Sequence, residues 1–310
     1  YEDINGIPHE TKVKNINPYL IEGKDFALLS RTKVLCNVPP ILFGSKLVDN
    51  GNYLFTEEEK NCFLNQEPLA SEFFKEILSG DEFLNSTKRY CLWLKEISPS
   101  KLKDLKLVSE RVNNVRSFRL KSTKIPTQKA AEFPTLFAEL RQPASDFLLV
   151  PLTSSENRKY IPLGFFSKEF IVTNSCSVIA RASLFHFGVL SSIMHMAWVK
   201  YTCGRLESRF RYSNTIVYNN YPWPESPSEK QISAIETAAQ KVLDVRLQFP
   251  NSSLADLYDP LTMPPALVKA HHDLDKTVDL AYRPQPFASE AKRMEFLFDL
   301  YEKYTANLFI

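Results

Sequence analysis

The segment GRLESRFRYS, residues 204–213, carries the most distinctive pattern in the chain. Alternate side chains of an extended strand lie on the same face. One face would then carry an acid and two guanidiniums, Glu207, Arg209 and Arg211. The other would carry a hydroxyl and two aromatic rings, Ser208, Phe210 and Tyr212. We expect the aromatic face to pack and the charged face to meet solvent.

The charged face has the chemistry of a DNA reader. Arginine pairs bidentately with guanine in the major groove, and glutamate accepts a hydrogen bond from the amino group of cytosine. Glu207, Arg209 and Arg211 are therefore candidates for base reading. The alternative is an exposed ion-pair ladder without a function, because surface ion pairs are common and weak.

The segments around residues 204–213 predict a mixed α/β region. Apolar residues recur every three to four positions through residues 182–203, which predicts a helix capped by Gly204. Further helices, broken by proline, are expected in two regions, 57–80 and 99–140. Short β-rich runs are expected at 31–55, 88–94, 147–151, 160–166, 170–173, 177–180 and 215–220.

The sequence after Pro222-Trp223-Pro224 is helical throughout. Ser228 and Gln231 have the spacing of a capping box, and Pro265 suits the first turn of a helix. A third helix is expected to start at Ser289. These segments predict a small bundle, with the Pro-Trp-Pro segment as its boundary.

The net charge of +2 conceals an asymmetry. Residues 225–310 hold 9 Lys+Arg against 13 Asp+Glu, so the first 224 residues hold 29 against 23. The densest basic run is Lys101, Lys103, Lys106, Arg111, Arg116, Arg119, Lys121, Lys124 and Lys129. We expect it to grip DNA phosphates, chiefly through Arg111, Arg116, Arg119, Lys121 and Lys124. The alternative is a solvated helix face.

Several classes of site are not expected. No run reaches the roughly 18 apolar residues of a membrane span. The five cysteines are scattered without a CxxC motif, which favours free thiols in a reducing compartment, the cytoplasm. His271 and His272 are adjacent on an expected helix and cannot converge on one metal ion. Ser154-Ser155-Glu156 lacks the glycine elbow of a serine hydrolase.

A set of motifs resembles, in the same order, the MmeI-type restriction-modification enzymes and the related YeeA-like DNA methyltransferases. The motifs are Asn37-Val38-Pro39-Pro40, Arg89-Tyr90-Cys91-Leu92-Trp93-Leu94, Arg141-Gln142-Pro143, Ser154-Ser155-Glu156, Tyr160-Ile161-Pro162, His195-Met196-Ala197-Trp198, GRLESRFRYS, Tyr221-Pro222-Trp223-Pro224, Leu254-Ala255-Asp256-Leu257-Tyr258-Asp259-Pro260 and Lys269-Ala270-His271. The resemblance implies an α/β (α+β) target-recognition domain at 31–224 and a small all-α domain at 225–310.

The parts that such an enzyme needs for chemistry are missing from these residues. The chain has 8 glycines in 310 residues and no GxGxxG-like turn for S-adenosylmethionine. Asn37-Val38-Pro39-Pro40 has an inserted valine, and Asn17-Pro18-Tyr19 lacks a proline of the catalytic loop. We therefore expect a non-catalytic recognition half without a cofactor of its own. Residues 1–30 would connect it to an upstream methyltransferase domain that binds S-adenosylmethionine.

The resemblance also implies partners and site residues. The partner would be double-stranded DNA, in which the upstream domain methylates a flipped adenine. The base-reading positions correspond to Glu207, Arg209 and Arg211, with a second group at Asn174 and Ser175. Weaker candidates for DNA contact or support are Ser154, Ser155, Arg158 and Arg205. Two other classes stay open, a protein-interaction module that docks an acidic partner and an independent enzyme.

Overall fold

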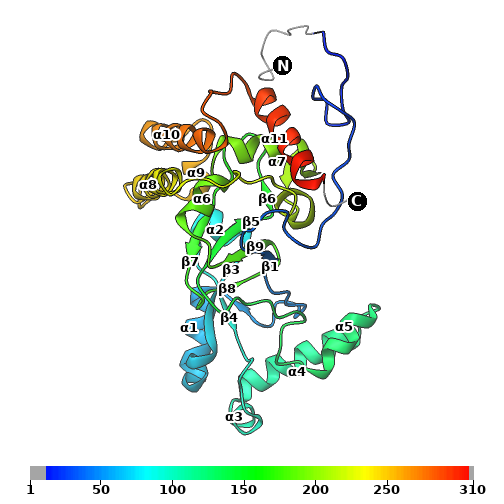
Figure 1. Ribbon diagram of the computed structural model, residues 1–310. Helices are drawn as coiled ribbons and strands as arrows, with labels where there is room; N and C mark the ends of the chain where they lie inside the picture. Colours follow the sequence, from blue (N-terminus) through cyan, green and yellow to red (C-terminus); the bar gives the residue numbers. More distant parts are fainter. Residues whose placement is uncertain (1–11, 307–310) are drawn as a thin grey trace. The chain divides into compact units, whose positions relative to one another are not determined.

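The computed structural model describes residues 12–306, and the chain divides into two compact units. Unit 1 comprises residues 1–41, 150–164 and 179–310, and unit 2 comprises residues 42–149 and 165–178. Both units are assembled from segments that are separated in the sequence. The mixed α/β class with a helical C-terminal region is confirmed (Figure 1).

Unit 2 is organised around a four-stranded sheet in the order β2-β4-β3-β8. Its strands are β2 (Leu54–Phe55), β3 (Phe74–Leu78), β4 (Tyr90–Leu92) and β8 (Ile171–Val172). β4 pairs antiparallel with β2 and β3, whereas β8 pairs parallel with β3. A second sheet has the order β1-β9-β5-β7, with strands Ile41–Phe43, Cys176–Ala180, Phe147–Pro151 and Gly164–Phe166.

The helices of unit 2 are α1 (Glu57–Gln66), η1 (Pro68–Phe73), α2 (Gly80–Asn85), α3 (Pro99–Asp104), α4 (Lys106–Leu120), α5 (Ile125–Lys129) and η2 (Ala130–Glu132). Three of them, α1, η1 and α4, contribute buried side chains to the hydrophobic core of the first sheet. A capping box of Thr56 and Glu59 starts α1, and Val108, Val112 and Val115 form the buried stripe of α4.

The helix expected through residues 57–80 is wrong beyond Phe73. Residues 74–78 form β3, because Lys75 pairs with Cys91 of β4 on one edge and Ile77 with Ile171 of β8 on the other. Pairing with strands distant in sequence overrides the local helical pattern. The helices expected in residues 99–140 are confirmed as α3, α4 and α5.

Unit 1 contains most of the helices. They are α6 (Leu184–Leu190), α7 (Ile193–Thr202), η3 (Asn214–Tyr218), α8 (Glu229–Arg246), α9 (Leu254–Leu257), α10 (Pro265–Tyr282) and α11 (Glu290–Thr305). The capping box of Ser228 and Gln231 and the cap at Ser289 are confirmed. α8 packs along α10 (Figure 1) and against α6. The second contact requires Gly188, where a Cβ would lie 2.6 Å from Cγ2 of Ile235.

Three expectations for unit 1 need correction. The helix expected at 182–203 is interrupted by Ser192, whose hydroxyl donates to Val189 O and accepts from His195 N to start α7. Gly204 does not cap that helix but begins a strand. The strand expected at 215–220 is the single π-helical turn η3, closed by hydrogen bonds from Asn220 Nδ2 to the carbonyls of Thr215 and Ile216.

The segment expected to be a connector lies partly outside the described residues. In residues 12–30, Tyr19 and Phe26 pack on Phe298 of α11, with ring centroids 5.2 and 4.7 Å from it. Unit 1 includes both sides of Pro222-Trp223-Pro224, so its contacts do not divide the chain at that segment.

Candidate nucleic-acid interface

Residues 204–211 form a tight β-hairpin in unit 1. β10 (Gly204–Leu206) pairs antiparallel with β11 (Arg209–Arg211), with Leu206 opposite Arg209. Glu207 and Ser208 form the two-residue turn between them, where Glu207 has a φ of 57°. A left-handed φ is uncommon for a residue other than glycine and marks local strain. The expectation that Glu207 lies on one strand with Arg209 and Arg211 is therefore corrected, because Glu207 occupies the turn.

The alternation expected in β11 is confirmed. Arg209 and Arg211 are exposed, whereas Phe210 and Tyr212 are buried. The Tyr212 hydroxyl lies 3.0 Å from Nε2 of the buried His195. Burial lowers the pKa of His195 to about 3, so this imidazole is neutral at physiological pH. The side chains buried beneath the hairpin are therefore uncharged, whereas its exposed face carries the charged side chains.

Glu207 and Arg209 are paired in the hairpin. Arg209 Nη2 donates to Glu207 Oε2 at 2.6 Å, and their side chains are 46% and 76% exposed. At this exposure the ion pair adds little to folding stability. Since arginine has five N–H donors and glutamate two acceptor oxygens, both retain groups for a further partner.

Arg205 supports the hairpin from β10. Its guanidinium lies 4.1 Å from the ring centroid of Phe210 and donates to the carbonyl oxygens of Ser208 and Lys200. These contacts tie the turn to the strand before it. A direct contact of Arg205 with DNA stays a prediction.

Strand β6 (Thr153–Ser154) completes a three-stranded sheet in the order β10-β11-β6. Ser154 pairs with Phe210 and is 3% exposed, and no partner of its hydroxyl lies among the described residues. The expectation that Ser154 contacts DNA is wrong, because its side chain faces the interior. Ser155 follows it and accepts hydrogen bonds from Asn157 N at its hydroxyl and Arg158 N at its carbonyl.

The chain after this turn is anchored on the C-terminal helices. The Tyr160 hydroxyl donates to the Asp275 carboxylate at 2.7 Å, and its ring stacks on His271 at 4.0 Å. Asp275 also accepts from Ile193 N at 2.8 Å. Burial raises the pKa of Asp275 to about 6. Burial lowers the pKa of Arg158, which lies in the field of the Asp259 carboxylate.

The second group expected to read bases lies in unit 2. Asn174 and Ser175 are both exposed, in the turn between β8 and β9. The Ser175 hydroxyl accepts from Gly80 N at 3.0 Å and lies 2.8 Å from Thr173 Oγ1. The side chain of Ser175 is therefore held in the fold of unit 2, and base reading by either residue stays a prediction.

The basic run contains one residue that cannot contact phosphates. Arg119 is fully buried and donates to five carbonyl oxygens, those of Leu47, Val48, Ala130, Phe133 and Leu136. The expectation that Arg119 contacts DNA phosphates is wrong, because its guanidinium is buried and hydrogen-bonded inside unit 2. Arg119 follows Val108, Val112 and Val115 at intervals of three or four residues, so it lies on the same inner face of α4.

The other residues of the basic run differ in how far their side chains are exposed. Arg111 is partly buried, with its guanidinium 5.0 Å from the Phe55 ring. Arg116, Lys121 and Lys124 are exposed, and the structure gives them no salt bridge among the described residues. These three keep the charge that a phosphate contact requires.

Comparison with known proteins identifies the family. The model described as "MmeI, target recognition domain" matches residues 22–225, and "MmeI, C-terminal domain" matches residues 227–309. The chain belongs to the MmeI family.

The MmeI relatives are much longer than this chain. DNA methyltransferase A of Bacillus subtilis (strain 168) is 40% identical over 298 residues, which are 96% of this chain and 34% of that protein. The solved structure of the Type IIL restriction-modification enzyme MmeI in complex with DNA is 47% identical, with a TM-score of 0.92. The match covers 99% of this chain and 41% of the MmeI chain.

Within residues 12–306, no three His, Cys, Asp or Glu side chains are placed to hold a metal, and no helix is long and apolar enough to cross a membrane. Trp223 is 3% exposed and packs among aromatic rings, as expected of a packing residue. All five cysteines are free thiols.

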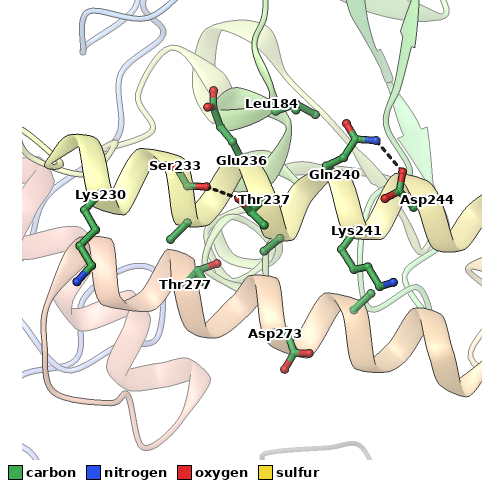
Figure 2. Close-up of a pocket in the computed structure, with 13 residues that line it drawn as sticks. Leu184, Lys230, Ser233, Glu236, Thr237, Gln240, Lys241, Asp244, Asp273 and Thr277 are labelled. Atoms are coloured by element: carbon green, nitrogen blue, oxygen red, sulfur yellow. Dashed lines mark hydrogen bonds between the residues drawn. The ribbon is translucent and has the colours of Figure 1, made fainter.

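A hollow of about 940 Å³ lies along α8 and α10 (Figure 2). Two of its polar side chains bond along α8 itself, Thr237 to the carbonyl of Ser233 and Gln240 to Asp244.

The sequence pattern missed Glu156. The Ser208 side chain in the hairpin turn is the main cause of the lowered pKa of Glu156. The sequence alone does not place Glu156 near the hairpin, because that placement depends on the pairing of Ser154 with Phe210.

Proposed function

We propose that this chain is the sequence-specific recognition module of a site-specific DNA adenine methyltransferase of a restriction-modification system. The observation that carries the proposal is the hairpin of residues 204–211. It presents a glutamate and two arginines above the buried rings of Phe210 and Tyr212. The chain is closely similar to one solved in complex with DNA. An ion pair this exposed adds little to folding stability, which supports a role in recognition for these groups.

We assign the residues to two tasks. Base reading falls to Glu207, Arg209 and Arg211, with Asn174 and Ser175 as a second group. Phosphate contact falls to the exposed cations Arg116, Lys121 and Lys124, because they are free of salt bridges to other described residues. The remaining candidates, Arg111, Ser155, Arg158 and Arg205, support these surfaces.

The proposal also covers organisation and location. We place a target-recognition domain at residues 31–224 and a helical domain at 225–310, with residues 1–30 as connector. The methyltransferase chemistry and S-adenosylmethionine would belong to a domain upstream of it, because residues 1–310 hold no glycine-rich cofactor turn. Such a protein would act in the cytoplasm, where bacterial DNA lies.

The test is an exchange of the hydrogen-bonding pattern at the hairpin. If Glu207 and Arg209 read one C·G pair, Glu207→Lys with Arg209→Asp reverses donor and acceptor. The double variant should then prefer G·C at that position and keep the rest of its site. A good bidentate contact gives about 1–3 kcal/mol of discrimination, or roughly ten- to a hundredfold.

The measurement is selection of bound duplexes from a randomised DNA library by the full-length protein, followed by sequencing. Each single variant should discriminate less than either matched pair, because one group then faces the wrong base edge. A double variant that keeps the parental base would show that the pair is structural. Binding of the wild type without any sequence preference would reject the proposed function and favour docking of an acidic protein.

A further inference from the structure

Residues 24–40 lie in unit 1 and, within this described range, form no helix or strand. Every side chain in the range is exposed or half-buried. Such a segment gains little free energy from burying apolar area, so hydrogen bonds of its backbone have to fix its path. The partners of that backbone include η3 and the two asparagines that follow it, Asn219 and Asn220.

Asn219 and Asn220 hold this segment through their side-chain amides. Asn219 Nδ2 donates to Arg31 O at 2.7 Å, and Asn220 Nδ2 donates to Leu29 O at 2.9 Å. Both asparagines are buried, and a buried amide without a partner is destabilising. The two amides therefore restrain the backbone of residues 29–31 to one path.

Asn220 also shapes the helical turn that precedes it. Its Nδ2 lies 3.1 Å from Thr215 O and 3.0 Å from Ile216 O, two carbonyls of η3. The Tyr301 hydroxyl of α11 donates to its Oδ1 at 3.4 Å. π-helical turns are rare and frequently lie at functional sites. One buried side chain thus joins residues 24–40 to η3 and α11.

The same turn is tied to the recognition hairpin. Only Tyr212 and Ser213 separate β11 from η3, and Tyr212 is buried. On its other side η3 is held by the buried Trp198 of α7, whose Nε1 donates to Val217 O at 3.0 Å. A short path of buried and hydrogen-bonded residues therefore runs from the exposed arginines of β11 to residues 24–40.

We propose that Asn219 and Asn220 are positioning residues that fix residues 29–35 relative to the hairpin. This inference rests on the proposed function, which places a methyltransferase domain upstream of these residues. It deepens that function by naming contacts that set the spacing between the bases that the hairpin reads and the adenine that is methylated. A displacement of about 1 Å can lower a reaction rate about a hundredfold, so this spacing controls methylation.

The experiment locates the methyl group that the full-length protein adds to DNA. Asn219→Ala and Asn220→Ala, singly and together, remove the side-chain bonds to residues 29–31. The substrates are duplexes that keep the selected recognition site and carry adenines at a series of neighbouring positions. The wild type should methylate one position. The double variant should methylate neighbouring positions as well, with kcat at the parental position lower by about ten- to a hundredfold.

Two further readouts separate positioning from a general loss of stability. The variants should select the same duplexes from a randomised library as the wild type, because the hairpin is unchanged. Amide hydrogens in the peptide of residues 29–35 should exchange faster, since Arg31 N and Leu35 N donate to Thr215 O and Asn219 O in the wild type.

The matched control is Tyr53→Phe in unit 2. It also removes a donor on a buried side chain from a backbone carbonyl, that of Pro134. Its melting temperature should fall about as far as that of Asn219→Ala. It should nevertheless methylate one position with the kcat of the wild type, and exchange in residues 29–35 should stay unchanged.

Three results would overturn the inference. One is a double variant that methylates the parental position alone with the kcat of the wild type. Another is a loss of base preference together with kcat, which would show that the asparagines support the hairpin itself. The third is an equal loss of kcat in Tyr53→Phe. If Asn220→Ala does not fold, the same readouts on Asn219→Ala decide, because that variant leaves the bonds of Asn220 to η3 in place.

Failure of this inference is distinguishable from failure of the proposed function. If the wild-type protein selects no sequence, the proposed function itself is rejected. If the wild type selects a site and the asparagine variants methylate it at the same position and rate, the function stands and the two asparagines have no part in positioning.

Discussion

The hairpin of unit 1 and helix α4 of unit 2 are both rich in arginine, but they use it in opposite ways. In the hairpin, Arg209 and Arg211 alternate with buried aromatic residues and face solvent. In α4, Arg119 points inward, and its guanidinium donates hydrogen bonds to backbone carbonyls. Positive charge in a sequence therefore indicates a DNA contact only where the backbone pattern directs that charge outward.

The largest effect that tests this comparison is on stability. Arg119→Met keeps an apolar stem but leaves five carbonyl oxygens without their buried donor. We expect the free energy of unfolding to fall by about 3–5 kcal/mol. Urea denaturation measures it. The matched control Arg116→Ala, one turn earlier and exposed, should stay within about 0.5 kcal/mol of the wild type. An equally mild Arg119→Met would place that guanidinium at the surface.

The second effect is the pH dependence of stability that comes from His195, which is buried beneath the hairpin. His195 has a pKa of about 3 in the folded protein because burial disfavours its charged form. The unfolded state therefore binds more protons below pH 6.5, and stability falls as the pH is lowered. From pH 7.5 to 5, His195 should remove about 2 kcal/mol.

The measurement is the free energy of unfolding at both pH values in the wild type and His195→Gln. The variant should lose clearly less stability between them. His272→Gln, on the exposed face of α10, should stay closer to the wild type, although burial also lowers the pKa of His272. Asp275 acts in the opposite direction, since its raised pKa makes stability fall as the pH rises through about 4 to 6. It contributes equally to all three proteins and cancels. Equal pH dependence in His195→Gln and the wild type would show that His195 is solvated.

The smallest effect sharpens the role of the outer face of α4. Arg116→Ala with Lys121→Ala should weaken binding to all duplexes alike. Each lost phosphate contact should reduce the slope of log K against log salt concentration by about 0.9. Titrations at several salt concentrations measure this slope, with Arg209→Ala as a contrast that changes sequence preference. An unchanged slope would assign both residues to a solvated face.

Local signals in the sequence predicted much of this molecule, and their failures have a common cause. The caps at Ser228 and Ser289 and the in-out alternation of β11 depend on neighbours within a few residues, and all are confirmed. The pairing of β3 with β8 and the burial of Arg119 depend on partners tens of residues away. A single sequence contains no record of such pairings.

The division of the chain into interleaved segments has a consequence for the order of synthesis. Every residue of unit 2 precedes residue 179, so that unit can complete its contacts while the chain is still growing. Unit 1 cannot, because β6 at 153–154 has to wait for β11 at 209–211, and Tyr19 and Phe26 wait longer for Phe298 of α11, which is made last. We infer that unit 2 is the first to fold, and that the recognition hairpin acquires its shape only late in translation.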